Sequence, residues 1–69
     1  MTELKLSKII YEHENIKEAV DDFSTMAYFK VTEFDEYYLI SISDSKYPEE
    51  RTVKEFENYL IDLTYKRRK

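Results

Sequence analysis

Three short segments of the chain alternate between apolar and polar residues, which is the pattern of strands with one buried face. The first covers residues 4–11, the second residues 27–32 and the third residues 37–42. The apolar residues that share one face of the first segment are Leu4, Leu6 and Ile10. The second and third segments are separated by a polar turn at residues 34–36, so we expect them to form a β-hairpin.

A first helix is predicted from Asn15 onwards, because asparagine favours the N-cap position. Glu18 follows three residues later and completes an Asn-x-x-Glu capping box. Apolar residues then recur three and four positions apart, at Ile16, Ala19, Val20 and Phe23. We expect this helix to end near Thr25 or Met26.

A second amphipathic helix is predicted in the last third of the chain. Its start has two candidates, with Pro48 at the first helical position or Thr52 as an N-cap followed by Glu55. The residues that form its buried stripe are Val53, Phe56, Leu60 and Leu63. Their spacing of three and four residues gives the helix one apolar side.

The order of these elements is β-α-β-β-α, which predicts an α+β fold in a single domain over residues 1–69. A three-stranded antiparallel sheet with two helices on one face satisfies the pattern. With the third strand in the centre, the order 1-3-2 is a truncated ferredoxin-like fold that lacks the final strand. A sheet with the first strand beside the second is the alternative.

In the 1-3-2 order the first strand has a free edge, which can accept a strand from a peptide or from a second copy of the chain. Lys5 and Lys8 are expected to protect this edge from aggregation. The sheet face away from the helices would carry Tyr28, Lys30, Tyr37 and Leu39. This face is rather apolar for a solvent-facing surface, so Tyr28 and Tyr37 are candidate partner-binding residues.

Composition restricts the functional class. The chain has no cysteine and no glycine, so it cannot form a disulfide, a cysteine-held iron–sulfur cluster or a glycine-rich phosphate loop. No apolar run approaches the roughly 20 residues that span a bilayer. No signal-peptide pattern follows residues 1–3. We therefore expect a soluble cytoplasmic protein.

Charge is distributed unevenly along the chain, whose formal net charge is −4. Residues 1–50 contain twelve acidic residues and five lysines, whereas residues 51–69 contain six basic and three acidic residues. The acidic first part argues against nucleic acid as a partner. The terminal bases, which include Arg67 and Arg68, either complement the C-terminal end of a helix dipole or contact an acidic partner.

Residues suited to catalysis are few. His13 is the single histidine, and no cysteine or second histidine is present to complete a metal site. Asp21 and Asp22 are adjacent, so their side chains would diverge by about 100° on a helix, and we expect them to be solvated. No serine adjoins the histidine in sequence. We expect neither enzymatic activity nor a bound cofactor or metal ion.

Asn58 and Asp62 are the most distinctive polar residues of the predicted second helix. Because they are four residues apart, they lie one turn apart on the same side. The helix does not require either residue, so both are candidates for a partner-binding surface. The alternative is a solvated pair that interacts locally with Arg51, Lys54 or Lys66.

Two segments of the chain resemble the HxsD-like family, small proteins of His-Xaa-Ser radical-SAM peptide-maturation systems. The first segment has the spacing I-Y-x4-I-x2-A-x3-F and begins at Ile10. The second is E-F-x-N-x-L-I-D over residues 55–62, with Arg67 or Arg68 beyond it. The chain departs from the family in having Tyr59 within the second segment and four bases at its end.

The resemblance implies a non-catalytic accessory protein that binds a radical-SAM peptide-modifying enzyme, its ribosomal precursor peptide, or both. The iron–sulfur cluster and S-adenosylmethionine would belong to the partner enzyme. Asn58 and Asp62, with the basic end of the chain, would contact the partner. The alternative function is a stand-alone regulatory or inhibitor protein, monomeric or homodimeric, whose acidic part occupies a basic surface on its target.

Overall fold

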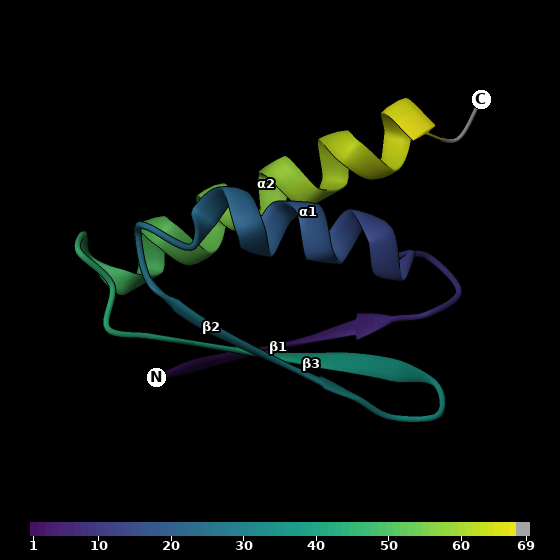
Figure 1. Cartoon of the computed structure of the whole chain (residues 1–69), viewed down its shortest axis with the longest axis horizontal. Helices are drawn as coiled ribbons and strands as arrows, with labels where there is room; N and C mark the ends of the chain where they lie inside the picture. Colours follow the sequence, from purple (N-terminus) through teal and green to yellow (C-terminus); the bar gives the residue numbers. More distant parts are fainter. Residues whose placement is uncertain (68–69) are drawn as a thin grey trace.

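The elements form in the predicted order in the computed structural model, which describes residues 1–67. They are β1 (Thr2–Ser7), α1 (His13–Phe23), β2 (Tyr28–Glu33), β3 (Tyr37–Ser43) and α2 (Glu49–Arg67). Both helices cover one face of the sheet (Figure 1), which confirms the α+β class. Within residues 1–67, neither helix combines the length and the apolar composition needed to cross a membrane.

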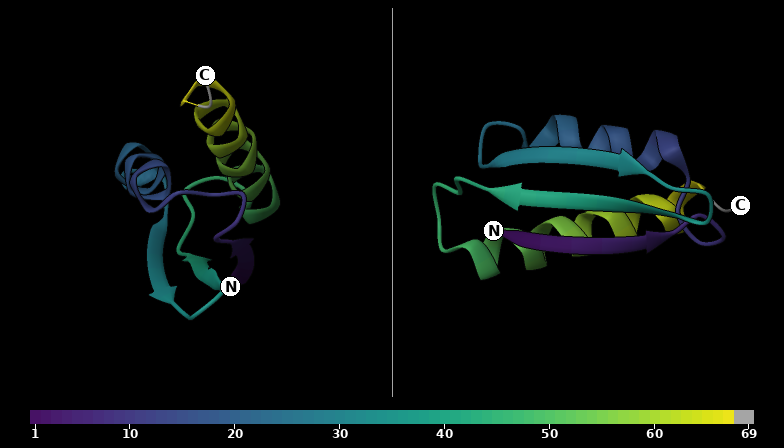
Figure 2. Two further views of the ribbon diagram at one scale, coloured as in Figure 1. Left: turned by 90° about the vertical axis from the view of Figure 1, so that its right-hand side faces the viewer. Right: turned by 90° about the horizontal axis from the view of Figure 1, so that it is seen from below.

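β3 is the central strand of the sheet, with the order β1-β3-β2. It pairs antiparallel with both neighbours, so that Ile40 lies opposite Leu4 on one side and opposite Val31 on the other. This order confirms the truncated ferredoxin-like arrangement and excludes the alternative with the first strand beside the second. Both β1 and β2 are therefore edge strands, as the view from below the sheet shows (Figure 2).

The core lies between the sheet and the two helices. Ile40 and Ile42 of β3 are fully buried beneath the helices. The ring of Phe56 lies 5.6 Å from that of Phe23 and 4.9 Å from that of Phe29, so aromatic side chains join α2 to α1 and to β2. The predicted stripe of α2 is buried at each of its positions, Val53, Phe56, Leu60 and Leu63.

β1 ends at Ser7, earlier than the sequence pattern predicts. The carbonyl oxygen of Ser7 accepts hydrogen bonds from the backbone N–H groups of Ile10 at 3.2 Å and Tyr11 at 2.9 Å. This turn directs the chain towards α1. Ile10 is consequently 49% exposed, and its predicted place on the buried face of the strand is wrong.

Lys8 also lies outside the edge strand on which it was expected. Its Nζ lies 2.6 Å from Glu33 Oε2 and 5.0 Å from the ring centroid of Tyr38. The hydrogen bond of this pair, with its charge, raises the pKa of Lys8 and lowers the pKa of the Glu33 carboxyl. Lys8 therefore links the ends of β1 and β2, and Lys5 is left on the β1 edge.

The start of α1 differs from the predicted capping box. The N–H of Ile16 donates to the carbonyl oxygen of Glu12 at 3.2 Å, so Glu12 occupies the N-cap position, without a side-chain cap bond. Asn15 lies inside the helix and is 1% exposed, and its Oδ1 has no hydrogen-bond partner among the described residues. The capping prediction is wrong because the buried face of α1 extends to Asn15 itself. The helix ends at Phe23, before the predicted Thr25.

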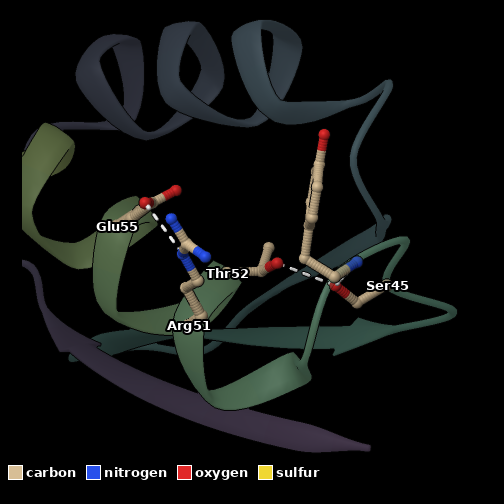
Figure 3. Close-up of polar contacts among 5 residues, drawn as sticks. Ser45, Arg51, Thr52 and Glu55 are labelled. Atoms are coloured by element: carbon tan, nitrogen blue, oxygen red, sulfur yellow. Dashed lines mark hydrogen bonds and ion pairs between the residues drawn. The ribbon is translucent and has the colours of Figure 1, made fainter.

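α2 begins at Glu49, directly after Pro48. The carbonyl oxygen of Pro48 accepts hydrogen bonds from the N–H groups of Arg51 at 3.0 Å and Thr52 at 3.2 Å. Thr52 is buried, and its hydroxyl lies 2.7 Å from the hydroxyl of Ser45 (Figure 3). Pro48 thus precedes the first helical position by one residue. Thr52 is not an N-cap but ties α2 to the loop after β3.

Asp44, in the same loop, adopts the left-handed backbone region with a φ of 51°. Glycine usually takes such positions because it has no Cβ to clash with the carbonyl oxygen. The chain has no glycine. Aspartate tolerates this region better than most residues because its short polar side chain can bond locally.

Candidate functional site

The outer edge of β1 presents unpaired backbone groups in a defined order. The N–H of Lys8 donates to the carbonyl oxygen of Glu36 at 3.1 Å, which continues the register of the β1–β3 ladder by one residue. In an antiparallel ladder, hydrogen-bonded and non-hydrogen-bonded pairs alternate. The backbone groups of Glu3, Lys5 and Ser7 therefore point away from β3. The carbonyl oxygen of Ser7 is already bonded to the N–H groups of Ile10 and Tyr11, so a strand added at this edge would pair with Glu3, Lys5 and the N–H of Ser7.

The side chains of β1 divide between the two faces of the sheet. Leu6, opposite the buried Tyr38, faces the helices, and Leu4 shares that side and is half-buried. Glu3 and Lys5 point to the open face, and both are exposed. A strand added to this edge would therefore meet an apolar side chain beneath the helices and two opposite charges on the open face.

A groove of about 660 Å³ lies between the start of β1 and the first half of α2. It is lined by Thr2, Pro48, Glu50, Arg51, Val53, Lys54 and Glu57. Seen from below the sheet, the first turns of α2 project beyond the outer edge of β1 (Figure 2). Thr2 represents β1 in this lining, so the groove meets the free edge at the start of the strand and has the first half of α2 as its wall.

A side-chain hydrogen bond joins β1 to α2 beside this groove. The hydroxyl of Thr2 donates to Glu49 Oε2 at 2.6 Å, and the bond lowers the pKa of the Glu49 carboxyl. The bond joins the first residue of β1 to the first residue of α2. The bond therefore links the start of the edge strand to the helix that flanks it.

A second groove of about 660 Å³ borders the other end of β1, on the open face. It is lined by Lys5, Ser7, Lys8, Ile9, Asp35, Glu36 and Tyr37. The Nζ of Lys5 lies 4.4 Å from the ring centroid of Tyr37, a cation–π contact. Grooves therefore border β1 at both of its ends.

The two tyrosines predicted to bind a partner lie on the open face of the sheet. Tyr28 is 61% exposed at the start of β2. Tyr37 is half-buried, and its ring stacks on that of Phe34 at a centroid distance of 4.8 Å. Tyr37 is thus held by its neighbours Phe34 and Lys5, whereas Tyr28 offers most of its ring to solvent.

Asn58 and Asp62 are both exposed on α2, one turn apart. They lie on the side of the helix away from its buried stripe, so they approach neither the β1 edge nor the tyrosines. Among the described residues, Arg51 pairs with Glu55 at 3.6 Å (Figure 3) rather than with either of them. Arg67 is the last residue of α2, and Arg68 lies outside the described residues.

The residues weighed for catalysis do not converge. His13 is exposed at the start of α1, with its ring 5.8 Å from that of Tyr38. Asp22 accepts a hydrogen bond from the hydroxyl of Tyr59, so it links α1 to α2 instead of being only solvated. Within residues 1–67, no three histidine or acidic side chains are placed to hold a metal ion.

The sequence did not reveal the groups that define this edge. The outward direction of the backbone at Glu3, Lys5 and Ser7 depends on the register of β1 against β3, and no residue type signals that register. The alternation of charge and leucine in Glu3, Leu4 and Lys5 was the available clue. No family model matches the chain, and no curated protein or solved structure is similar enough to it to indicate a relationship.

Proposed function

We propose that this chain is a non-catalytic accessory protein that binds an extended peptide segment along the free edge of β1. The observation that carries the proposal is the row of outward backbone groups at Glu3 and Lys5, continued by the N–H of Ser7 and bordered by grooves at both ends of the strand. Strand addition of this kind takes its affinity from backbone hydrogen bonds and its specificity from alternate side chains.

The setting we propose is the maturation of a ribosomally made peptide by a radical-SAM enzyme, and it rests on the resemblance to the HxsD-like family. In that role the chain would hold the precursor peptide, the enzyme, or both. The edge of β1 would bind an extended segment of the precursor peptide. The exposed face of α2 that carries Asn58 and Asp62 would bind the folded enzyme. The peptide and the enzyme would thus bind to two separate surfaces of the chain.

Replacement of Lys5 by proline tests the edge directly. The N–H of Lys5 points to the free edge, so proline removes a group that a bound strand needs while leaving the ladder with β3 intact. Lys5→Thr is the matched control, because it removes the charge but keeps the N–H. The measurement is co-purification of the tagged protein from its native cells, followed by mass spectrometry.

We expect the wild type and Lys5→Thr to recover a ribosomal precursor peptide, alone or with a radical-SAM enzyme, and Lys5→Pro to lose the peptide. Equal recovery by Lys5→Pro would show that the edge is not the binding site. Recovery of neither a precursor peptide nor a radical-SAM enzyme would contradict the accessory role. Recovery of a target with a basic surface, such as a nuclease, would instead support the inhibitor function.

A separate prediction concerns the exposed face of α2. Asn58→Ala and Asp62→Ala remove side chains that have no part in the core, so each should change the free energy of unfolding by no more than about 0.5 kcal/mol. Both variants should nevertheless weaken recovery of the enzyme partner in the same co-purification. Lys17→Ala, exposed on α1, serves as the control. Normal recovery by both α2 variants would remove this face from the interface.

A further inference from the structure

We propose that the free edge of β1 also pairs with β1 of a second copy of this chain, antiparallel and centred on Leu4. The two-fold axis would pass between the two Leu4 residues and join two three-stranded sheets into one continuous sheet. This inference goes beyond the proposed function, because it requires no peptide and no enzyme partner. It rests on the charges and backbone directions of three consecutive residues.

The charges of β1 are complementary to themselves in this register. Glu3 and Lys5 both point to the open face, one on each side of Leu4. Antiparallel pairing about Leu4 places Glu3 of each copy opposite Lys5 of the other, so that two pairs of opposite charge form. Directly opposed charges of opposite sign stabilise an antiparallel pair.

The backbone groups fit the same register. Glu3 and Lys5 both have N–H and C=O groups that point outward, and the register pairs these two residues with each other. The ladder can therefore close with hydrogen-bonded pairs at both positions. Leu4 then forms a non-hydrogen-bonded pair with its own copy, in which the side chains come closest. That contact lies on the helix side, where Leu4 is only half-buried.

Other registers of self-pairing are less favourable. Centring on Lys5 would place two lysines opposite each other, and centring on Glu3 would oppose two glutamates. Like charges directly opposite on neighbouring strands are destabilising. Three registers have thus been compared, centred on Glu3, Leu4 and Lys5. Among them, only the register centred on Leu4 places both charged side chains opposite a charge of the other sign.

Self-pairing and peptide binding exclude each other, because both use the outward backbone groups of Glu3 and Lys5. Two six-residue strands make a small contact compared with the roughly 1,200–2,000 Å² interfaces of stable complexes, so we expect a weak, concentration-dependent dimer. A peptide that binds the edge would release the monomer. The dimer would then keep an exposed edge covered until the peptide arrives.

Charge reversal tests the register without any partner. The measurement is sedimentation equilibrium of the purified protein, from roughly 10 μM to 1 mM, for the wild type, Glu3→Lys, Lys5→Glu and the double variant. Each single reversal creates two like-charged pairs, so we expect about a tenfold or greater increase in the dimer dissociation constant. The double variant restores opposite charges at both positions and should recover dimerisation. Lys30→Glu, on the open face of the other edge strand, should behave as wild type.

Three results would overturn the proposal. They are a wild type that stays monomeric over the whole range, a dimer that the single reversals leave unchanged, and a double variant that does not regain association. None of these results involves the peptide, so the proposed binding function is tested separately by the Lys5→Pro variant. Far-ultraviolet circular dichroism of each variant confirms that the fold is retained before association is compared.

Discussion

Replacing Phe56 with alanine is expected to leave the chain largely unfolded at 25 °C. The side chain of Phe56 is fully buried and its ring contacts those of Phe23 on α1 and Phe29 on β2. Truncation of such a residue costs about 3–5 kcal/mol. A core of this size supplies a net stability of only about 3–5 kcal/mol, so one substitution removes most of it.

The measurement is urea denaturation followed by far-ultraviolet circular dichroism. Ile61→Ala is the matched control, since Ile61 lies on the same helix but is 38% exposed. We expect a change of less than about 1 kcal/mol for this control. A loss below about 1 kcal/mol for Phe56→Ala would show that Phe56 does not join the layers of the core as described.

Leu4→Pro is expected to abolish the native sheet, whereas Lys5→Pro is expected to preserve it. The alternation of the β1–β3 ladder directs the N–H of Leu4 to β3 and that of Lys5 to the free edge. Proline at Leu4 would remove a ladder bond and leave a carbonyl oxygen of the buried central strand unpaired. Together with the lost leucine packing, this should cost at least about 3 kcal/mol.

The two proline variants are compared by the free energy of unfolding in urea and by amide hydrogen exchange of β3. Lys5→Pro should retain protection at Ile40 and Ile42, and Leu4→Pro should lose it. The register of β1 against β3 requires this difference in stability between the two variants, because the N–H groups of Leu4 and Lys5 point in opposite directions. Similar destabilisation by both substitutions would mean that the outward groups of β1 are assigned to the wrong residues, and both proposals for this edge would then fail.

The sequence predicts the fold well where burial repeats with a regular period. The spacing of Val53, Phe56, Leu60 and Leu63 identifies the buried face of α2, and alternation about Ile40 identifies β3. In each case many weak apolar preferences agree, so a single exception does not change the outcome. The short hairpin was predicted from the sequence, whereas the choice between the 1-3-2 order and a sheet with the first strand beside the second needed the structure.

Prediction failed where one polar residue had to decide a boundary. Asn15 is a favourable cap by type, yet it lies within α1 because the buried face of that helix includes it. The bonds to the Ser7 carbonyl end β1 before Ile10, and alternation alone does not show this. Local preferences of about 1 kcal/mol give way when tertiary packing favours another arrangement.

The candidate site was only partly accessible from the sequence, for a similar reason. The free edge of β1 was expected once the strand order was chosen, and Tyr28 and Tyr37 were correctly assigned to the open face. The direction of each backbone group depends on a register that shifts with every residue. The link between Asp22 and Tyr59 joins residues far apart in sequence, which no local pattern signals.

The left-handed Asp44 has a consequence for the unfolded chain. A turn that would usually require glycine is made by a residue with a Cβ, and the chain contains no glycine at any other position. At the usual frequency of about 7%, a chain of this length would contain about five glycines. Each would add roughly 0.5–1 kcal/mol to the entropy lost on folding. The absence of glycine therefore reduces the conformational entropy that this small domain loses on folding, an effect that acts on the unfolded chain and not through any native contact.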